Sequence, residues 1–146
     1  TLTAKVRWED SIEDFSKDEA RAAKKTFHTV QVIPATDKNV AITNAKPLSF
    51  GEFEGKSITL VQFDIETGRK HQIRAQSSFH GYPLLGDIAY GGEKLSGKAF
   101  FLHALSLSFT KDNQLSLPDK ITAPLPKDFS NFIKSFLINC HEDFII

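Results

Sequence analysis

Methionine is absent from the 146-residue sequence, and cysteine occurs once, as Cys140. A single cysteine excludes an internal disulfide framework and a cysteine-based zinc site, so we expect a buried structural thiol. The missing methionine leaves two alternatives: an initiator methionine was removed before Thr1, or the chain is a piece of a longer protein. The sequence also lacks a run of about 18 apolar residues, which a transmembrane helix needs, and a signal-peptide pattern. We therefore expect a cytoplasmic protein.

An excess of charge of either sign is missing too, because 18 basic and 18 acidic side chains cancel. Nucleic-acid binding would therefore depend on a local patch rather than on overall charge. Repeats, low-complexity tracts and flexible linkers are absent as well. The 40% of apolar residues is enough for one core. We expect a single unit, 1–146, with an edge strand and exposed connection in 1–25 and a motif-bearing core in 26–146.

Alternation of apolar and polar residues predicts most of the regular structure. We expect strands at 2–7, 26–33, 57–66 and 101–109, an exposed connection at 9–25, a turn at 36–39, and a loop marked by Gly51 and Gly55. The strand at 57–66 would place one apolar face inward, formed by Val61, Phe63 and Ile65. A helix is expected from about Lys127 to Cys140, with a core-facing stripe made of Phe129, Phe132, Ile133, Phe136 and Leu137. Strands followed by helices predict the α+β class.

The most informative stretch reads Thr67-Gly68-Arg69-Lys70-His71-Gln72-Ile73-Arg74. About ten helix-compatible residues follow the Thr-Gly pair, and Gly81 stands where a glycine ends a helix. The basic side chains fall on the turn and the first helical turns, where free N–H groups and the helix dipole favour anions. Lys70 and Arg74 would share one helix face. Two interpretations remain open here: a phosphate or carboxylate site, and an ordinary solvated helix start.

Three histidines and one acid offer the alternative of a metal site: His71, His80, His103 and Asp87. None of their pairs has the spacing of a metal motif, so we interpret the histidines as structural, hydrogen-bonded residues. Motifs of serine hydrolases, P-loop proteins and dinucleotide-binding proteins are absent. The glycines between residues 81 and 92 predict tight turns. Tyr82 and Tyr90 would either pack in the core or stack on nucleic-acid bases.

Taken together, residues 67–74, 80–87 and Tyr90-Gly91 closely resemble the block TGR-x-HQIR followed by GHP-(I/L)-x-GD-x-x-YG of the RluA-type RNA pseudouridine synthases. The resemblance continues through Leu102-His103-Ala104 and residues 123–129, and weakly at Lys25-Thr26. It implies the C-terminal half of that catalytic domain. The fold implied is the pseudouridine synthase fold, with a mixed or antiparallel sheet and flanking helices.

The activity implied by the resemblance is isomerisation of uridine to pseudouridine in rRNA or tRNA, without cofactor or metal. The family's nucleophile is an Asp in an HRLD motif, which this sequence lacks. The chain is therefore expected to be inactive alone and to need the N-terminal half of the same domain as its partner. A non-catalytic RNA-binding module of the same fold and an unrelated α+β domain with an anion site remain as alternatives.

Individual roles also follow from the resemblance. Arg74 matches the arginine that pairs with the catalytic Asp of the family. Such a pair suits the chemistry, because a neighbouring guanidinium keeps a carboxylate ionised and correctly oriented. Ile73 matches an apolar position of the base pocket, and Leu2 falls where the family has an active-site tyrosine. RNA contacts are expected from four residues, of which the last two are alternatively structural: Arg69, Lys70, His71 and Gln72.

Overall fold

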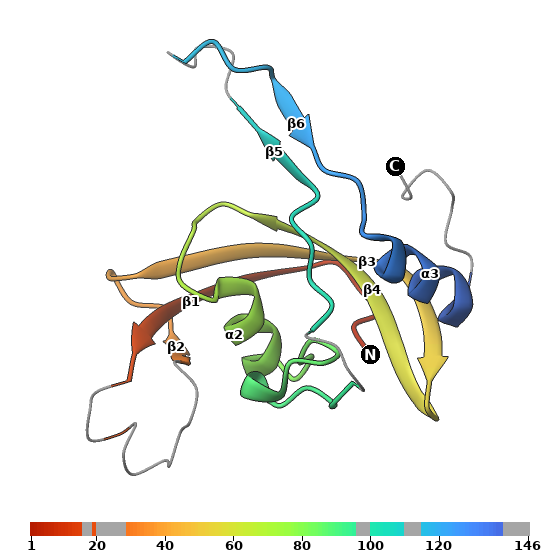
Figure 1. Cartoon of the computed structure of the whole chain (residues 1–146). Coiled ribbons are helices and arrows are strands. Elements are labelled where there is room, and N and C mark those ends of the chain that lie inside the picture. Colours follow the sequence, from red (N-terminus) through yellow and green to blue (C-terminus); the bar gives the residue numbers. More distant parts are fainter. Residues whose placement is uncertain (16–18, 20–28, 96–99, 110–114, 139–146) are drawn as a thin grey trace.

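The computed structural model describes residues 1–15, 19, 29–95, 100–109 and 115–138, so Cys140 and most of the predicted connection at 9–25 lie outside the described residues. The main feature is an antiparallel sheet in the order β2-β1-β3-β4, to which the short β7 adds by pairing with β3 (Figure 1). The predicted α+β class with an antiparallel sheet and flanking helices is confirmed. The elements are β1 Val6–Asp14, β2 Val30–Pro34, β3 Val40–Phe53, β4 Lys56–Ile65, α2 Gln72–Phe79, η1 Ile88–Tyr90, β5 Ser106–Ser108, β6 Lys120–Thr122, α3 Lys127–Phe136 and β7 Leu137–Ile138.

Strand β1 differs from the sequence-based prediction. The strand predicted at 2–7 begins only at Val6, and the segment from residue 9, predicted as an exposed connection, continues it. β1 is not an edge strand, because it pairs with β2 on one side and β3 on the other. Its alternate side chains Trp8, Asp10 and Ile12 are each 5% exposed. Glu9 and Glu13 lie on the other face, where Ser11 is buried between them. The segment was predicted as an exposed connection because its acidic and basic residues alternate over few apolar ones.

Strands β3 and β4 form a long hairpin. Its turn is Glu54-Gly55, where both residues have positive φ, 49° and 75°. Two consecutive left-handed residues are the geometry of a type I′ turn, which matches the twist of paired strands. The loop predicted at Gly55 is confirmed, whereas Gly51 lies within β3. The turn predicted at 36–39 connects β2 to β3, and the strand predicted at 57–66 is β4.

Two apolar clusters cover the face of the sheet on which α2 lies. Leu2 is 4% exposed in the second of them, so this residue packs in the core. Ile65, predicted to share a buried face with Val61 and Phe63, is 49% exposed because it lies at the end of β4, beyond the cluster. The first cluster contains Ile12, Val30, Ala41, Ala75 and Tyr90, and the second contains Leu2, Trp8 and Ala45 with Val61 and Phe63 packed against it.

A bulge in β3 changes which face of the sheet its side chains reach. The pairing with β4 shifts between Pro47 and Ser49, so one residue has no cross-strand partner. One extra residue reverses the side to which every later side chain points. Phe53 accordingly packs on α3, with its ring centroid 5.2 Å from that of Phe132 and 5.0 Å from that of Phe136. Figure 1 shows α2 and α3 on opposite sides of the sheet.

Helix α3 begins at Lys127 as predicted but ends at Phe136, because the next two residues form β7. Ile133, from the predicted stripe, is 1% exposed. The turn from α3 into β7 passes directly over Gly51, where an added Cβ would lie 1.8 Å from the carbonyl oxygen of Phe136. Close approach of two backbones therefore requires glycine at this position.

The strand predicted at 101–109 is regular only in β5, which pairs with β6 in a hairpin that projects from the body of the molecule (Figure 1). Leu107 and Ile121 face each other across the two strands, and their side chains are 64% and 45% exposed. The alternating pattern predicted a strand through all nine residues, but no described element covers the hairpin. A two-stranded ribbon needs such a cover for stability.

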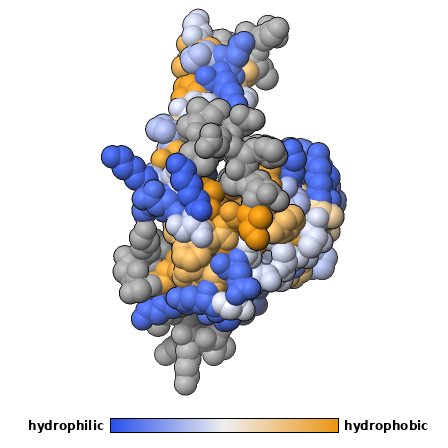
Figure 2. All heavy atoms as spheres, turned by 90° about the vertical axis from the view of Figure 1, so that its right-hand side faces the viewer, coloured by the Kyte–Doolittle hydropathy of each residue, from blue (hydrophilic) through white to orange (hydrophobic). Residues whose placement is uncertain are grey.

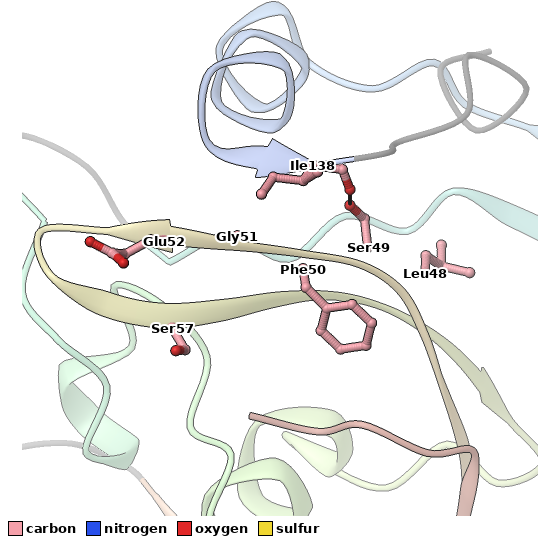
Figure 3. A pocket seen from close by; sticks show the side chains of 7 residues that line it. All are labelled: Leu48, Ser49, Phe50, Gly51, Glu52, Ser57 and Ile138. Atoms are coloured by element: carbon pink, nitrogen blue, oxygen red, sulfur yellow. Dashed lines mark hydrogen bonds between the residues drawn. The ribbon is translucent and has the colours of Figure 1, made fainter.

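Apolar side chains also gather on the face shown in Figure 2. At this end of the sheet Phe50, Phe136 and Ile138 are 43%, 38% and 68% exposed. An open groove of about 670 Å³ lies here (Figure 3), and its walls lack the convergent polar groups of a catalytic pocket. The groove is lined by Leu48, Ser49, Phe50, Gly51, Glu52, Ser57 and Ile138.

Among the described residues, no helix is long and apolar enough to cross a membrane.

We expect Gly51→Ala to lower the free energy of unfolding by about 2 kcal/mol or more, because the added methyl group forces the end of α3 away from β3. Gly68→Ala is the matched control, since nothing lies within 4 Å of the corresponding methyl position. Urea unfolding of both variants measures the difference. Equal stabilities of the two variants would contradict the close approach.

Candidate active site

The turn before α2 is fixed to the sheet by one amide side chain. Gln72 Nε2 donates to the carbonyl of Ile42 (3.0 Å) and to Thr43 Oγ1 (2.9 Å). Its Oε1 accepts from Thr67 Oγ1 and from the backbone N–H of Arg69, both at 2.9 Å. Four bonds are the full capacity of a side-chain amide, and Gln72 is only 4% exposed. Of its two expected roles, this geometry favours the structural one over RNA contact.

A second glutamine continues the polar contact between α2 and the sheet. Gln76 is fully buried; its Nε2 donates to Asp10 Oδ2 (2.7 Å) and to the carbonyl of Ala41 (3.0 Å), and its Oε1 accepts from Thr43 Oγ1 (2.7 Å). His80 Nε2 also lies 2.9 Å from Asp10 Oδ2. Asp10 was not among the expected site residues, because the acidic composition around it favoured a loop.

The helix ends as its sequence predicts. Gly81 has a φ of 85°, its N–H donates to the carbonyl of Ser78 (3.0 Å), and the N–H of Tyr82 donates to that of Ser77 (2.7 Å). These two bonds form a Schellman motif, in which a left-handed glycine follows the last helical residues. The start differs from the prediction: α2 begins at Gln72, so Lys70 precedes the helix and shares no helix face with Arg74.

Arg74 is the centre of the site, and its partner lies in the loop after α2. Its Nε and one terminal nitrogen each lie 2.8 Å from one carboxylate oxygen of Asp87, a two-pronged ion pair. The hydrogen bonds to Asp87 raise the pKa of Arg74. The guanidinium carbon also lies 4.9 Å from the ring centroid of Tyr90 and 4.4 Å from that of Phe100. Cation–π contacts of this kind hold the plane of the group.

The loop from residue 84 to 93 places Asp87 and Tyr90. It closes through hydrogen bonds from Gly86 N–H to the carbonyl of Glu93 (2.9 Å) and from Gly92 N–H to that of Asp87 (2.8 Å). An added Cβ at Gly92 would lie 2.0 Å from the carbonyl oxygen of Leu84. The predicted tight turns are therefore confirmed. These turns also place Asp87 against Arg74, and the sequence did not predict this role for Asp87.

Tyr90 is buried, and of its two expected roles the structure supports packing. Its hydroxyl oxygen accepts from the backbone N–H of Val30 (2.9 Å) and lies 3.0 Å from His71 Nδ1. Burial raises the pKa of Tyr90. Burial also lowers the pKa of His71, and the positive charges of Arg74 and Lys70 lower it further. The two nearby carboxylates, Asp87 and Asp14, oppose this shift without cancelling it.

The other expected site residues occupy the surface beside Arg74. Arg69 is exposed, and its Nε donates to the carbonyl of Val40 (2.9 Å). Lys70 forms an exposed ion pair with Asp14, with 2.7 Å between Nζ and Oδ1. Ile73 is half-buried, and its place in a base pocket stays a prediction.

The three histidines of the metal alternative have separate partners. His71 contacts Tyr90, His80 contacts Asp10, and His103 Nε2 lies 3.2 Å from the carbonyl oxygen of Ala123. Within the described part of the chain, no three metal-ligating side chains come together. This geometry supports the structural interpretation of the histidines.

No family model matches the chain. In sequence, the chain is 42% identical over 81 residues to YjbO of Bacillus subtilis (strain 168), an uncharacterized RNA pseudouridine synthase. The matched region covers 53% of the chain and 27% of the relative. The chain is 30% identical over 113 residues to ribosomal large subunit pseudouridine synthase C of Rickettsia prowazekii (strain Madrid E), covering 76% of the chain and 36% of the relative. Its structure matches human RNA pseudouridylate synthase domain containing 1 with a TM-score of 0.68 and 22% identity, over 99% of the chain and 59% of the human protein.

These comparisons confirm the resemblance to RNA pseudouridine synthases that the motifs around Arg74 indicated. The curated relatives are RNA pseudouridine synthases, and the fold is that of a pseudouridylate synthase domain. In every case the matched region is less than two thirds of the length of the other protein.

We expect the depressed pKa of His71 to make the fold less stable in mild acid. Below the ordinary histidine pKa of about 6.5 the unfolded chain binds a proton that folded His71 does not, so stability falls as the pH decreases through this value. His71→Asn should lose less free energy of unfolding between pH 7.5 and pH 5 than the wild-type protein loses. Denaturant unfolding at both pH values measures this, and His103→Asn is the control, because His103 contacts the uncharged carbonyl of Ala123. An identical pH dependence of His71→Asn and wild type would contradict the shift.

Proposed function

We propose that this relative of the RNA pseudouridine synthases is the C-terminal part of an RluA-type catalytic domain that isomerises uridine to pseudouridine in rRNA or tRNA. The chain supplies the arginine side of the active site and part of the RNA-binding surface. The Asp nucleophile comes from the N-terminal half of the same domain, outside these 146 residues. A cytoplasmic location is part of the same proposal.

The observation that carries the proposal is the state of Arg74. The side chain is 17% exposed, and the ion pair with Asp87 occupies Nε and one terminal nitrogen. The other terminal nitrogen has no hydrogen-bond partner among the described residues. It can bind a second carboxylate, and a charge-assisted bond of this kind keeps such a group ionised and in place.

Asp87 is unsuited to be the nucleophile itself. Its side chain is 1% exposed, and each of its oxygens is bound to Arg74. A nucleophile has to reach the substrate, whereas this carboxylate is enclosed and turned towards the arginine. Its role in the proposal is to orient the guanidinium. This assignment agrees with the absence of an HRLD motif from the sequence.

The reaction needs a bond exchange on one nucleotide. The N1–C1′ glycosidic bond breaks, a C5–C1′ bond forms, C5 loses its hydrogen as a proton and N1 gains one. No cofactor or metal takes part in this balance. A uridine inside folded RNA has to leave its stack to react, and exposed Arg69 and Lys70 beside the site would bind the flanking phosphates. Ile73 would contact the extruded base.

The proposed partner explains surfaces that a complete domain would cover. Leu107 and Ile121 on the β5–β6 hairpin are exposed, and the outer edge of β4 has no paired strand within the described part of the chain. Exposed apolar ribbons and open sheet edges are features that proteins normally cover. The N-terminal half of the domain is the proposed cover.

Release of tritium from RNA labelled with [5-³H]uridine tests the function directly, because the C5 hydrogen leaves during isomerisation. We expect release by the protein made from the entire reading frame that contains this chain, and none by residues 1–146 alone. Turnover by residues 1–146 alone would contradict an external nucleophile. Absence of turnover by the entire product, combined with salt-sensitive RNA binding, would favour the non-catalytic module instead.

Arg74→Lys should reduce kcat of the active protein by about a hundredfold, because lysine keeps the charge but loses the planar fork that binds two carboxylates. Lys70→Ala is the control: it removes an exposed cation whose ion pair with Asp14 contributes little, so a few-fold rise in KM is expected. Initial rates of tritium release give both constants. Similar, small losses in the two variants would contradict the role of Arg74.

A further inference from the structure

The backbone of His71 is unusual for its position. It has a φ of 52° and a ψ of 23°, a left-handed conformation, immediately before the first residue of α2. Side chains at this position normally accept a hydrogen bond from the first helical N–H groups, but the His71 side chain makes no such bond. Its ring extends to Tyr90 instead, with an edge-on contact at 5.8 Å between centroids. The strained residue therefore contributes to the site rather than to the helix end.

The hydrogen bonds of Tyr90 favour one tautomer of His71, in which the hydrogen is on Nε2. The N–H of Val30 donates to the tyrosine oxygen, so the hydroxyl hydrogen is available to donate to His71 Nδ1. His71 then accepts at Nδ1 and carries its hydrogen on Nε2. This arrangement requires a neutral ring. Burial and the charges of Arg74 and Lys70 lower the pKa of His71 and so favour the neutral form.

Tyr90 connects this hydrogen bond to Arg74. The tyrosine ring lies 4.9 Å from the guanidinium carbon. Tyr90 is the last residue of the short helix η1, which begins directly after Asp87. Tyr90 is also bound through its carbonyl, which accepts from Ser78 Oγ at 2.6 Å. Asp87 fixes one edge of the guanidinium, and Tyr90 contacts its face together with Phe100. Movement of the tyrosine would remove one of the contacts that orient the other terminal nitrogen of Arg74.

We infer that His71 is a positioning residue that acts through Tyr90 to hold Arg74 in its working orientation; this inference rests on the proposed function and goes beyond it. The ring of His71 holds the tyrosine hydroxyl, the tyrosine holds the guanidinium, and the guanidinium holds the nucleophile. His71 performs no chemistry on the substrate in this scheme. Small misplacements of a positioned group reduce turnover strongly, so its loss affects kcat rather than RNA binding.

Three variants of the active protein separate this role from folding. His71→Gly removes the ring and also the left-handed strain, so we expect an unchanged or higher melting temperature, a kcat lowered about tenfold and a KM within about twofold of wild type. His71→Asn tolerates the same backbone conformation and keeps an acceptor near the position of Nδ1, so it should recover most of kcat. Tyr90→Phe should lose as much as His71→Gly, and the double variant should lose no more than either, because the residues act in series.

Asn39→Gly is the matched control, since Asn39 is also left-handed (φ 52°) and lies in the turn before β3. It should leave kcat unchanged. The inference is overturned if His71→Gly keeps the wild-type kcat, or if His71→Asn is no better than His71→Gly.

An NMR measurement on the purified protein distinguishes failure of the inference from failure of the proposed function. The Nε–H signal of Arg74 should be sharp and protected from exchange in wild type and His71→Asn, and broadened in His71→Gly and Tyr90→Phe. The ¹⁵N shifts of His71 should show hydrogen on Nε2. An unaltered Arg74 signal in His71→Gly would overturn the inference whether or not the protein isomerises uridine, whereas absence of tritium release with the expected NMR changes would overturn only the proposed function.

Discussion

The structure depends above all on the hydrogen bonds by which Gln72 and Gln76 fix α2 to strands β1 and β3. An apolar helix face tolerates sliding, because its contacts have no direction. Two buried amides allow a single position, since a small shift would leave donors and acceptors without partners in a dry interior. Arg74 lies between these two residues in sequence, so its position on the opposite side of the helix is fixed through theirs.

The sequence motif indicated where the candidate site lies, but it did not indicate all the residues that form it. The motif around Arg74 and the left-handed Gly81 indicated a turn and a helix, and both are present. The partner Asp87 was not predicted, because it lies thirteen residues further along the chain and reaches Arg74 only through a loop closed by specific backbone bonds. Such a loop conformation is not encoded by local periodicity. Gln72 was considered for RNA contact because polarity alone does not distinguish buried from exposed amides.

The fold shows the same division between local and long-range information. Strand β4 and helix α3 were predicted because each has a local apolar pattern, although burial along β4 is even rather than alternating and Phe136 of the α3 stripe is exposed. Strand β1 was mistaken for a surface connection because it has many charged and few apolar side chains. Strand β3 gave no alternating signal, since Pro47 and the bulge after it interrupt the pattern. The pattern at 101–109 predicted a longer strand than is present, because extended pairing needs a neighbouring layer.

The bulge at Leu48 has a consequence for how the chain tolerates changes in length. One strand carries two helices on opposite faces only because a single additional residue separates its two halves. Deletion of that residue would turn Phe53 to the face of α2 and direct a different side chain at the backbone that now passes over Gly51. Insertions and deletions should therefore accumulate in the β5–β6 hairpin, while β3 evolves by substitution, or by paired length changes that restore its phase.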